Sequence, residues 1–285
     1  MLKYTKLSVD TLIIGNTENC NATDCNGKRT PCNHCLRGNM RKNKICHSMM
    51  NKIVDTFDNI FCVTFGAGEI TMHLDSIRWF IEAVQFSVKE KYVGNFYIVT
   101  NAKVYRPELE RLCDALYNIC GDNEISGLAV SDDRFHMSMH KSYNKFCQNR
   151  DRYMYGSETY KEYKYDLFKE LMKPYADPNG KKTKEWDFSN AGIINMGKAK
   201  ENGLGVRELK PYKPTVEFDE DTGEVKLYDS EIFVRYNGDI FCSCNLSYDE
   251  MDKGIKSPFY LGSIHNIQAI VDKLWEEQGG ENGWD

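Results

Sequence analysis

Short apolar segments alternate with amphipathic segments over about the first two hundred residues of the chain. The apolar segments are rich in β-branched and aromatic residues and predict strands at 11–15, 60–65, 96–101, 128–131 and 193–196. Between them, apolar residues recur at helical spacing in 74–86 and in a segment opened by Pro107, a residue that suits a first helical turn. This alternation predicts βαβ units, a parallel sheet and therefore an α/β fold.

The pattern changes after residue 205. Short strands are predicted there at 215–218, 225–228, 232–235 and 240–243. Asp221-Thr-Gly223 and Asn237-Gly238 are turn signals that indicate hairpins between these strands. A final amphipathic helix is predicted at 266–277, and a further helix at 158–172 within a charged, tyrosine-rich segment. We therefore predict a core domain at 1–205 and a C-terminal extension at 206–285.

Composition narrows the possible classes of protein. Of 285 residues, 41% are apolar and 28% are charged, which is typical of a globular protein. The net charge of −5 argues against a nucleic-acid-binding surface. Since the chain has neither a long apolar stretch nor a secretory signal, we expect no membrane span and a cytoplasmic location. The 11 cysteines, an odd number without an export signal, indicate reduced thiols.

Four cysteines follow the first predicted strand within sixteen residues, at positions 20, 25, 32 and 35. Thiolates at such short separations can converge on one metal centre. Soft sulfur ligands favour zinc, copper(I) or an iron–sulfur cluster over hard cations. Cys20, Cys25, Cys32 and Cys35 are therefore the candidate metal ligands.

Polar or glycine-rich residues also end the other predicted strands of the core. They are Gly66, Ala67, Gly68 and Glu69 after the second strand, Asn101 after the third, Ser131 and Asp133 after the fourth, and Gly197 after the fifth. In α/β proteins the carboxyl ends of the strands form the reactive face. Gly66 and Gly68 would let backbone N–H groups approach a ligand, with Glu69 as an acceptor.

Together these motifs resemble the radical SAM enzymes over roughly residues 8–200. In that family a Cys-x3-Cys-x2-Cys loop after the first strand holds a [4Fe-4S] cluster, whose open iron binds the amino and carboxylate groups of S-adenosylmethionine. The resemblance implies a partial (β/α)6 TIM-like barrel with a small C-terminal β-hairpin and helix extension. It also implies that Cys20, Cys32 and Cys35 hold the cluster, with Cys25 as the alternative first ligand in a loop lengthened by an insertion.

The resemblance further implies contacts to S-adenosylmethionine. Ala67-Gly68-Glu69 is similar to the Gly-Gly-Glu motif that contacts the methionine amino group in the family, and Thr100-Asn101 resembles its third-strand motif. Ser131 and Asp133 stand where the family has contacts to the ribose, and Gly197 lies in a segment similar to a motif near the adenine. Ala67 and Ile70 stand where the family usually has glycine and proline. Since alanine suits most backbone conformations outside the left-handed region, we interpret residue 67 as a variant of the motif.

The implied enzyme takes an electron from an external low-potential donor and cleaves S-adenosylmethionine reductively. The resulting 5′-deoxyadenosyl radical abstracts hydrogen from a substrate that the sequence does not identify. The segment Tyr236-Asn-Gly238-Asp-Ile-Phe-Cys242 is similar to C-terminal extensions of peptide-modifying members, which favours a peptide or protein substrate.

Two alternatives remain open. A structural zinc site could use Cys20-x4-Cys25 and Cys32-x2-Cys35 as its two ligand pairs in a protein without catalytic activity. A degenerate radical SAM fold could instead act as a binding module.

Other residues invite minor hypotheses. Cys242 and Cys244 could contribute to an auxiliary cluster, although such a cluster needs about four thiolates. His34 is either a group near the adenine or a loop residue, and His136 and His140 are spaced to share a helix face.

Overall fold

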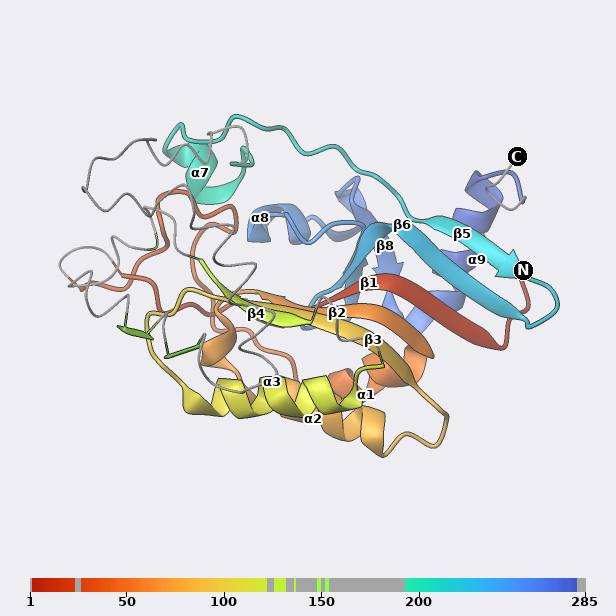
Figure 1. Ribbon diagram of the computed structural model, residues 1–285. Helices are drawn as coiled ribbons and strands as arrows, with labels where there is room; N and C mark the ends of the chain where they lie inside the picture. The colour runs from red at the N-terminus through yellow and green to blue at the C-terminus, as the bar shows by residue number, and fades with distance from the viewer. Residues whose placement is uncertain are drawn as a thin grey trace, which may run out of the picture.

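The computed structural model describes residues 2–23, 27–121, 126–131, 136, 148–149, 152–153 and 193–280. Within them the chain forms an eight-stranded mixed sheet and six α-helices (Figure 1). The strands are β1 (Lys6–Thr17), β2 (Asn59–Ala67), β3 (Tyr92–Thr100), β4 (Gly127–Val130), β5 (Thr215–Asp219), β6 (Glu224–Val234), β7 (Asp239–Phe241) and β8 (Tyr260–Ser263). The helices are α1 (His47–Thr56), α2 (Asp75–Gln85), α3 (Pro107–Ile119), α7 (Gly197–Glu201), α8 (Tyr248–Met251) and α9 (Ile267–Glu277).

The sheet has the strand order β4-β3-β2-β1-β6-β7-β8, and β5 also pairs with β6. Strands β1 to β4 are parallel, and β6 runs parallel to β1 on the side away from β2. The pairs β5–β6, β6–β7 and β7–β8 are antiparallel. Strand β1 therefore lies inside the parallel part of the sheet, between β2 and β6, and the cysteine loop begins at its carboxyl end.

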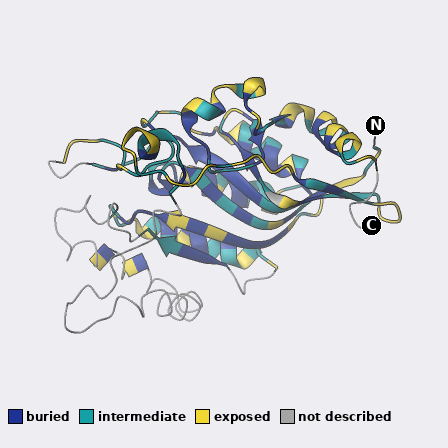
Figure 2. Cartoon of the chain, turned by 90° about the horizontal axis from the view of Figure 1, so that it is seen from above, coloured by how far each residue is buried: buried dark blue, intermediate teal, exposed yellow. Residues whose placement is uncertain are grey.

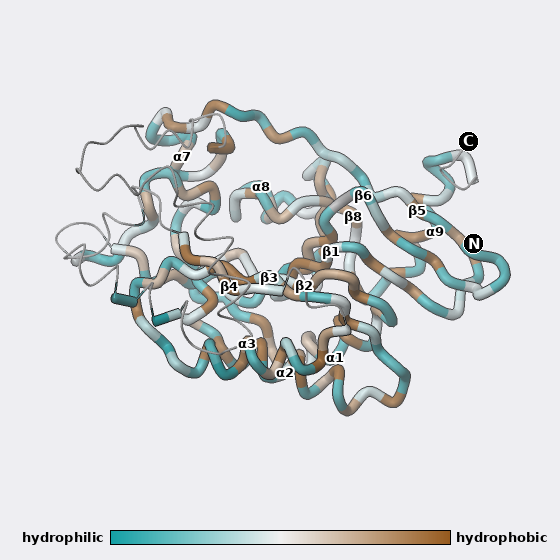
Figure 3. Tube along the Cα trace, in the orientation of Figure 1, coloured by the Kyte–Doolittle hydropathy of each residue, from teal (hydrophilic) through white to brown (hydrophobic). Residues whose placement is uncertain are grey.

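Helices α1, α2 and α3 cover one face of the parallel strands (Figure 1). Helix α2 buries Ile77, Phe80 and Ile81 on one side, as the spacing of its apolar residues predicts. The ring of Phe80 packs edge-on against Phe65 of β2, with 5.7 Å between centroids. In Figure 2 the outer sides of the helices are exposed and the central strands buried, and in Figure 3 the brown apolar stretches run along those strands. Burial of this apolar surface fixes the helices on the sheet.

The C-terminal helix α9 packs beside the start of the chain. The backbone N–H of Leu2 donates to Asp272 Oδ1 at 2.7 Å, and Gln268 Nε2 donates to the Leu2 carbonyl at 2.8 Å. The start of β1 and helix α9 consequently lie at the same side of the molecule in Figure 1.

The structure confirms the first four predicted strands and the three helices expected at 74–86, after Pro107 and at 266–277. The strand predicted at 193–196 is wrong, because Ile194 forms only an isolated bridge with Arg207. The strands predicted at 225–228 and 232–235 form one strand, β6, which continues through Asp229 at φ +64°. Helix α1 and strand β8 were not predicted. The helix predicted at 158–172 lies outside the described residues.

The described residues form a mixed α/β fold with a parallel sheet; closure into a partial barrel of six βα units stays a prediction. The domain boundary at 205/206 also stays a prediction. Strand β6, from the C-terminal side of that boundary, is hydrogen-bonded along β1 within the same sheet. No helix in the described part of the chain is both long and apolar enough to cross a membrane.

Candidate functional site

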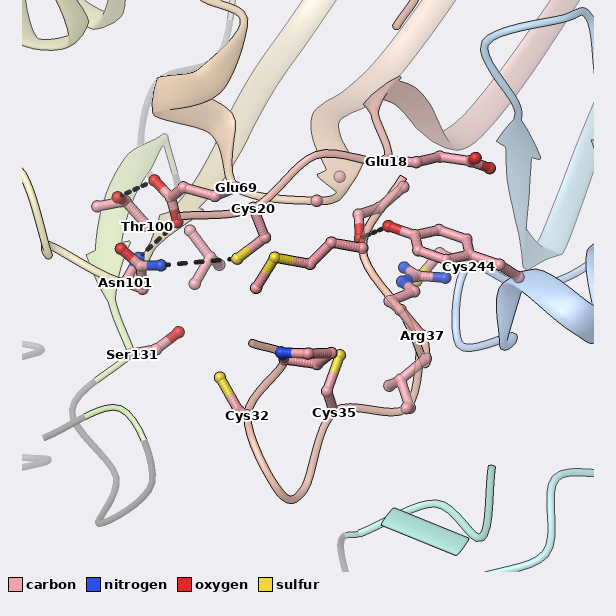
Figure 4. Close-up of a pocket in the computed structure, with 18 of the residues that line it drawn as sticks. Glu18, Cys20, Cys32, Cys35, Arg37, Glu69, Thr100, Asn101, Ser131 and Cys244 are labelled. Carbon is pink, nitrogen blue, oxygen red and sulfur yellow. Dashed lines mark hydrogen bonds between the residues drawn. The ribbon is translucent and has the colours of Figure 1, made fainter. Parts of the chain in front are cut away.

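A cavity of about 340 Å³ lies at the carboxyl ends of the parallel strands (Figure 4). The cysteine loop, the ends of β2, β3 and β4, and the segment after β7 all contribute to its walls. Its lining includes Glu18, Cys20, Cys32, His34, Cys35, Arg37, Met40, Gly66, Ala67, Gly68, Glu69, Thr100, Asn101, Ser131, His136, Cys244 and Tyr248. The tertiary structure thus brings most of the predicted site residues to one place.

Three of the four candidate cysteine ligands line this cavity: Cys20, Cys32 and Cys35. A turn in which the Cys35 N–H donates to the Cys32 carbonyl at 3.0 Å holds the second and third thiols on one loop. In Figure 4 the Cys20 sulfur lies across the cavity from those two. Burial, with the nearby Glu69 charge, raises the pKa of Cys20 to about 11. Cys25 lies outside the described residues.

In the described part of the chain, no three His, Cys, Asp or Glu side chains are close enough to hold one metal ion. The thiols of Cys20, Cys32 and Cys35 all line the cavity. A cluster of several metal atoms spans a greater distance between its thiolates than one ion does.

Glu69 joins the ends of β2 and β3. Its Oε1 accepts hydrogen bonds from the Thr71 N–H at 3.3 Å, the Thr71 hydroxyl at 2.8 Å and the Thr100 hydroxyl at 2.6 Å, and its Oε2 accepts from the Asn101 N–H at 2.9 Å. The side chain is buried. Because protein donors occupy both carboxylate oxygens, Glu69 fixes the geometry of the cavity wall formed by the ends of β2 and β3. The sequence did not indicate this role.

Asn101 and Ser131 complete the same wall. The Asn101 amide donates to Asn21 Oδ1 at 2.7 Å and faces the Cys20 sulfur at 4.0 Å, which links the end of β3 to the cysteine loop (Figure 4). The Ser131 N–H donates to the Thr100 carbonyl at 2.9 Å, and Ser131 lines the cavity. Asp133, the other residue predicted after β4, lies outside the described residues.

The glycine-rich end of β2 is shaped by contacts within the protein. A Cβ on Gly68 would lie 2.2 Å from the Asn19 carbonyl oxygen, so only glycine allows this approach to the cysteine loop. Gly66 has room for a Cβ, with Ile13 at 3.5 Å. Ala67 has φ +85°, which is the left-handed region. The expectation that Ala67 would avoid this region is wrong, because the chain must turn sharply there to bring Gly68 under the loop.

Gly197 supports the cysteine loop from outside the cavity lining. It has φ +53°, and a Cβ there would lie 2.3 Å from the Leu36 carbonyl oxygen. The following residues, Lys198 and Ala199, donate their N–H groups to the Cys35 carbonyl at 2.8 and 3.3 Å. The start of α7 therefore holds the loop at Cys35.

The opposite wall of the cavity comes from the cysteine loop and the segment after β7. The Arg37 guanidinium donates to the Leu246 carbonyl at 2.8 Å and stacks over the Phe233 ring, 5.7 Å from its centroid. The Tyr248 N–H donates to the Arg37 carbonyl at 3.0 Å, and its hydroxyl donates to the Ala67 carbonyl at 3.0 Å. Tyr248 thereby links α8 to both the cysteine loop and β2.

Beneath this wall lies a buried ion pair between Glu18 and Arg235. The guanidinium contacts Glu18 Oε1 at 2.6 Å and Asp252 at 2.8 Å. Glu18 Oε2 accepts from the Asn43 amide at 2.7 Å, and Arg41 lies 3.9 Å away. The pair fixes the start of the cysteine loop to the end of β6.

Two histidines meet at the cavity. The rings of His34 and His136 pack edge to face with centroids 4.9 Å apart, and both line the cavity. His140, which was expected to share a helix face with His136, lies outside the described residues.

Cys242 and Cys244 occupy different surroundings. Cys242 belongs to the hydrophobic core, where burial raises its pKa. Cys244 lines the cavity, and burial, countered by Arg37 and reinforced by Glu231, raises its pKa to about 12. An auxiliary cluster at these two thiols stays a hypothesis, and a single cluster at the cysteine loop stays the favoured interpretation.

Sequence reasoning missed Glu18, Arg37 and Tyr248 as residues of the site. Arg37 follows the last cysteine of the loop closely enough to have been noticed. Tyr248 and the pairing of Glu18 with Arg235 depend on long-range contacts and leave no local signal.

Fold and site together define a mixed α/β protein that gathers three cysteines at the carboxyl ends of its parallel strands. No protein-family model matches the chain, and no curated protein matches it. Solved structures similar to it are those of anSMEcpe, a radical SAM anaerobic sulfatase maturase, with bound AdoMet. The native anSMEcpe structure has a TM-score of 0.47 and 12% sequence identity, covering 94% of this chain and 81% of that one.

A structure of native anSMEcpe with bound AdoMet and Cp18Cys peptide is also similar, with a TM-score of 0.45, 12% identity, and coverage of 94% of this chain and 80% of that one. These are structures of an enzyme from the family that the sequence resembles. At such low identity and TM-score the likeness carries no argument about function, which must rest on the residues of the site.

Proposed function

We propose that the protein is a radical SAM enzyme that uses a [4Fe-4S] cluster and S-adenosylmethionine. The observation that carries the proposal is the meeting of Cys20, Cys32 and Cys35 around one cavity at the carboxyl ends of parallel strands. Cys20 reaches the cavity from the end of β1, and the other two come from a separate turn of the loop. In this proposal these three thiolates hold the cluster, and Cys25 is the alternative first ligand.

The donor set fits the proposed cluster. Thiolates are the usual protein ligands of iron–sulfur clusters. Three thiols, those of Cys20, Cys32 and Cys35, line one cavity of about 340 Å³ and could serve as these ligands. Because the Cys20 thiol has a pKa of about 11 in the metal-free protein, metal binding must displace its proton.

The wall formed by β2, β3 and β4 would bind S-adenosylmethionine through Gly66, Ala67, Asn101 and Ser131, with Asp133 and Gly197 as the remaining predicted contacts. Glu69 contributes by keeping Thr100 and Asn101 in place through its hydrogen bonds. Such preorganisation reduces the rearrangement needed on binding.

When bound, the cluster and S-adenosylmethionine supply reductive cleavage of the sulfonium C–S bond and a 5′-deoxyadenosyl radical that abstracts hydrogen. The chain's own residues position and shield this chemistry. Tyr248 closes the cavity between α8 and β2, since its hydroxyl binds the Ala67 carbonyl. The Glu18–Arg235 ion pair holds the loop that carries Cys20.

The proposal requires an external low-potential electron donor. It includes a peptide or protein substrate, which rests on the likeness of the C-terminal segment to peptide-modifying members. It also includes a cytoplasmic location, where thiols stay reduced.

The test is anaerobic reconstitution with iron and sulfide, followed by addition of reductant and S-adenosylmethionine. We expect brown protein with about four irons per chain that releases 5′-deoxyadenosine. Colourless protein with stoichiometric zinc would contradict the proposal and favour the structural zinc site. A cluster without 5′-deoxyadenosine would favour a binding module.

Separate Cys20→Ala and Cys25→Ala variants identify the first ligand. We expect only the first to abolish the cluster. Loss of the cluster in the Cys25 variant alone would transfer the assignment to that residue.

A further inference from the structure

The charges that line the cavity differ in how they are neutralised. Glu18 is paired with Arg235 at 2.6 Å, and Glu69 accepts four hydrogen bonds from protein groups. Arg37 has no carboxylate oxygen within 4 Å in the part of the chain that the structure describes. Among the described residues, Arg37 is therefore a cavity-lining charge with neither an ionic partner nor a full set of protein hydrogen bonds.

The Arg37 side chain is held in place by contacts that leave part of its guanidinium available. One nitrogen donates to the Leu246 carbonyl at 2.8 Å, and the group lies 5.7 Å from the centroid of the Phe233 ring. The residue is half-buried, so a partner there would be partly screened from water. A guanidinium held in this way is preorganised to donate its remaining N–H groups to a planar anion.

The position of Arg37 indicates which molecule it would meet. In Figure 4 it lies with Cys244 on the side of the cavity opposite Glu69, Thr100 and Asn101. The proposed function assigns the latter side to S-adenosylmethionine. A molecule at the side of Arg37 would then be the substrate.

We propose that Arg37 is a specificity-determining residue that binds a carboxylate of the substrate, so that the enzyme selects substrates carrying an acidic group. This inference rests on the proposed function for the placement of S-adenosylmethionine. A carboxylate matches the fork of guanidinium N–H donors, whereas an uncharged amide of the same shape offers one acceptor and no charge.

The test compares two probes that differ only in charge, N-acetylglutamate methylamide and N-acetylglutamine methylamide. Their dissociation constants are measured by calorimetry on the reconstituted protein, saturated with S-adenosylhomocysteine and without reductant. We expect the carboxylate probe to bind about tenfold more tightly, because hydrogen bonds to charged groups are the stronger ones. Arg37→Gln should bring the two constants together, and Arg37→Lys should restore part of the preference.

Arg41→Gln is the matched control. It removes the same charge from a neighbouring arginine that is paired with Asp252 at 2.8 Å and is not part of the cavity lining, so the preference should persist. Thermal unfolding of each variant verifies that it is folded. If Arg37→Gln does not fold, the comparison is made with Arg37→Lys.

Equal binding of the two probes by the wild-type protein would overturn the proposal, and so would a preference that survives in both Arg37 variants. A preference present without S-adenosylhomocysteine but lost when it is added would instead assign Arg37 to the amino-acid carboxylate of the nucleoside. The titration involves no turnover and can be repeated on protein without a cluster. The release of 5′-deoxyadenosine tests the proposed function, and the calorimetric titration tests the role of Arg37. The two proposals can therefore fail independently.

Discussion

Replacing Arg235 by glutamine should destabilise the protein and weaken the cysteine loop at the same time. Arg235 and Glu18 are both buried, with 5% and 1% of their side chains exposed, and lie 2.6 Å apart. Removing one partner of a buried ion pair costs about 3–5 kcal/mol in proteins, because the other charge loses its compensation. Glu18 would retain the Asn43 amide at 2.7 Å and the more distant Arg41 at 3.9 Å, so we expect the lower end, about 3 kcal/mol.

That loss corresponds to a decrease in Tm of about 6–12 °C, using the usual dependence for chains of this size. Thermal unfolding of the metal-free protein measures it. The double variant Glu18→Gln/Arg235→Gln should be more stable than the sum of the two single changes predicts, because it leaves no unpaired charge. Since Glu18 lies two residues before Cys20, the Arg235 variant should also bind less iron on reconstitution.

The control is Lys226→Gln, which breaks a partly exposed pair with Asp10 at 3.1 Å. Exposed pairs contribute at most about 1 kcal/mol. If Arg235→Gln lost no more stability than this control, the ion pair would not be the contact that secures the loop.

Three further changes address the same region and the core. Ala67→Gly should raise the free energy of unfolding by up to about 1 kcal/mol, because φ +85° strains alanine more than glycine, as chemical denaturation can measure. Gly68→Ala should lower it by about 1–3 kcal/mol and reduce iron binding, since the new Cβ would lie 2.2 Å from the Asn19 oxygen. Burial raises the pKa of the Cys62 thiol from 9.0 to about 11. The protonated thiol therefore contributes about 2–3 kcal/mol to the free energy of unfolding, a contribution that is complete below pH 9 and is lost as the pH rises towards 11. Unfolding of the metal-free protein across that range should show the decrease, and Cys62→Ala should reduce it.

Each of these predictions has a clear contrary result. A less stable Ala67→Gly variant would mean that the turn before Gly68 is not strained. Unchanged stability in Gly68→Ala would mean that the loop can move away without cost. An identical pH dependence in the wild type and Cys62→Ala would locate the titration elsewhere.

The cysteine loop shows how far local sequence could define the site. The four closely spaced cysteines after a strand, at positions 20, 25, 32 and 35, indicated a metal centre, and the structure places Cys20, Cys32 and Cys35 on one cavity. The premise that Ala67 lies outside the left-handed region failed, because the conformation of this residue is imposed by the path of the chain under the loop. That path depends on contacts between the ends of β1 and β2, which residue type alone does not reveal.

The sequence by itself determined the elements whose residues repeat with a clear period. The strands β1 to β4 and helices α2, α3 and α9 were predicted because burial of one face imposes that period. The carboxyl ends of strands β1 to β4 could be expected to lie at one edge of the sheet, because parallel strands all end at the same edge.

Only the tertiary structure decided how the C-terminal region joins the site. The sequence suggested a separate extension, but β6 pairs with β1 and brings Arg235 to Glu18. The same pairing places Tyr248 beside the cysteine loop. These contacts join residues roughly two hundred positions apart, and no local periodicity encodes them, because strand order and buried ion pairs are settled by packing of the whole chain.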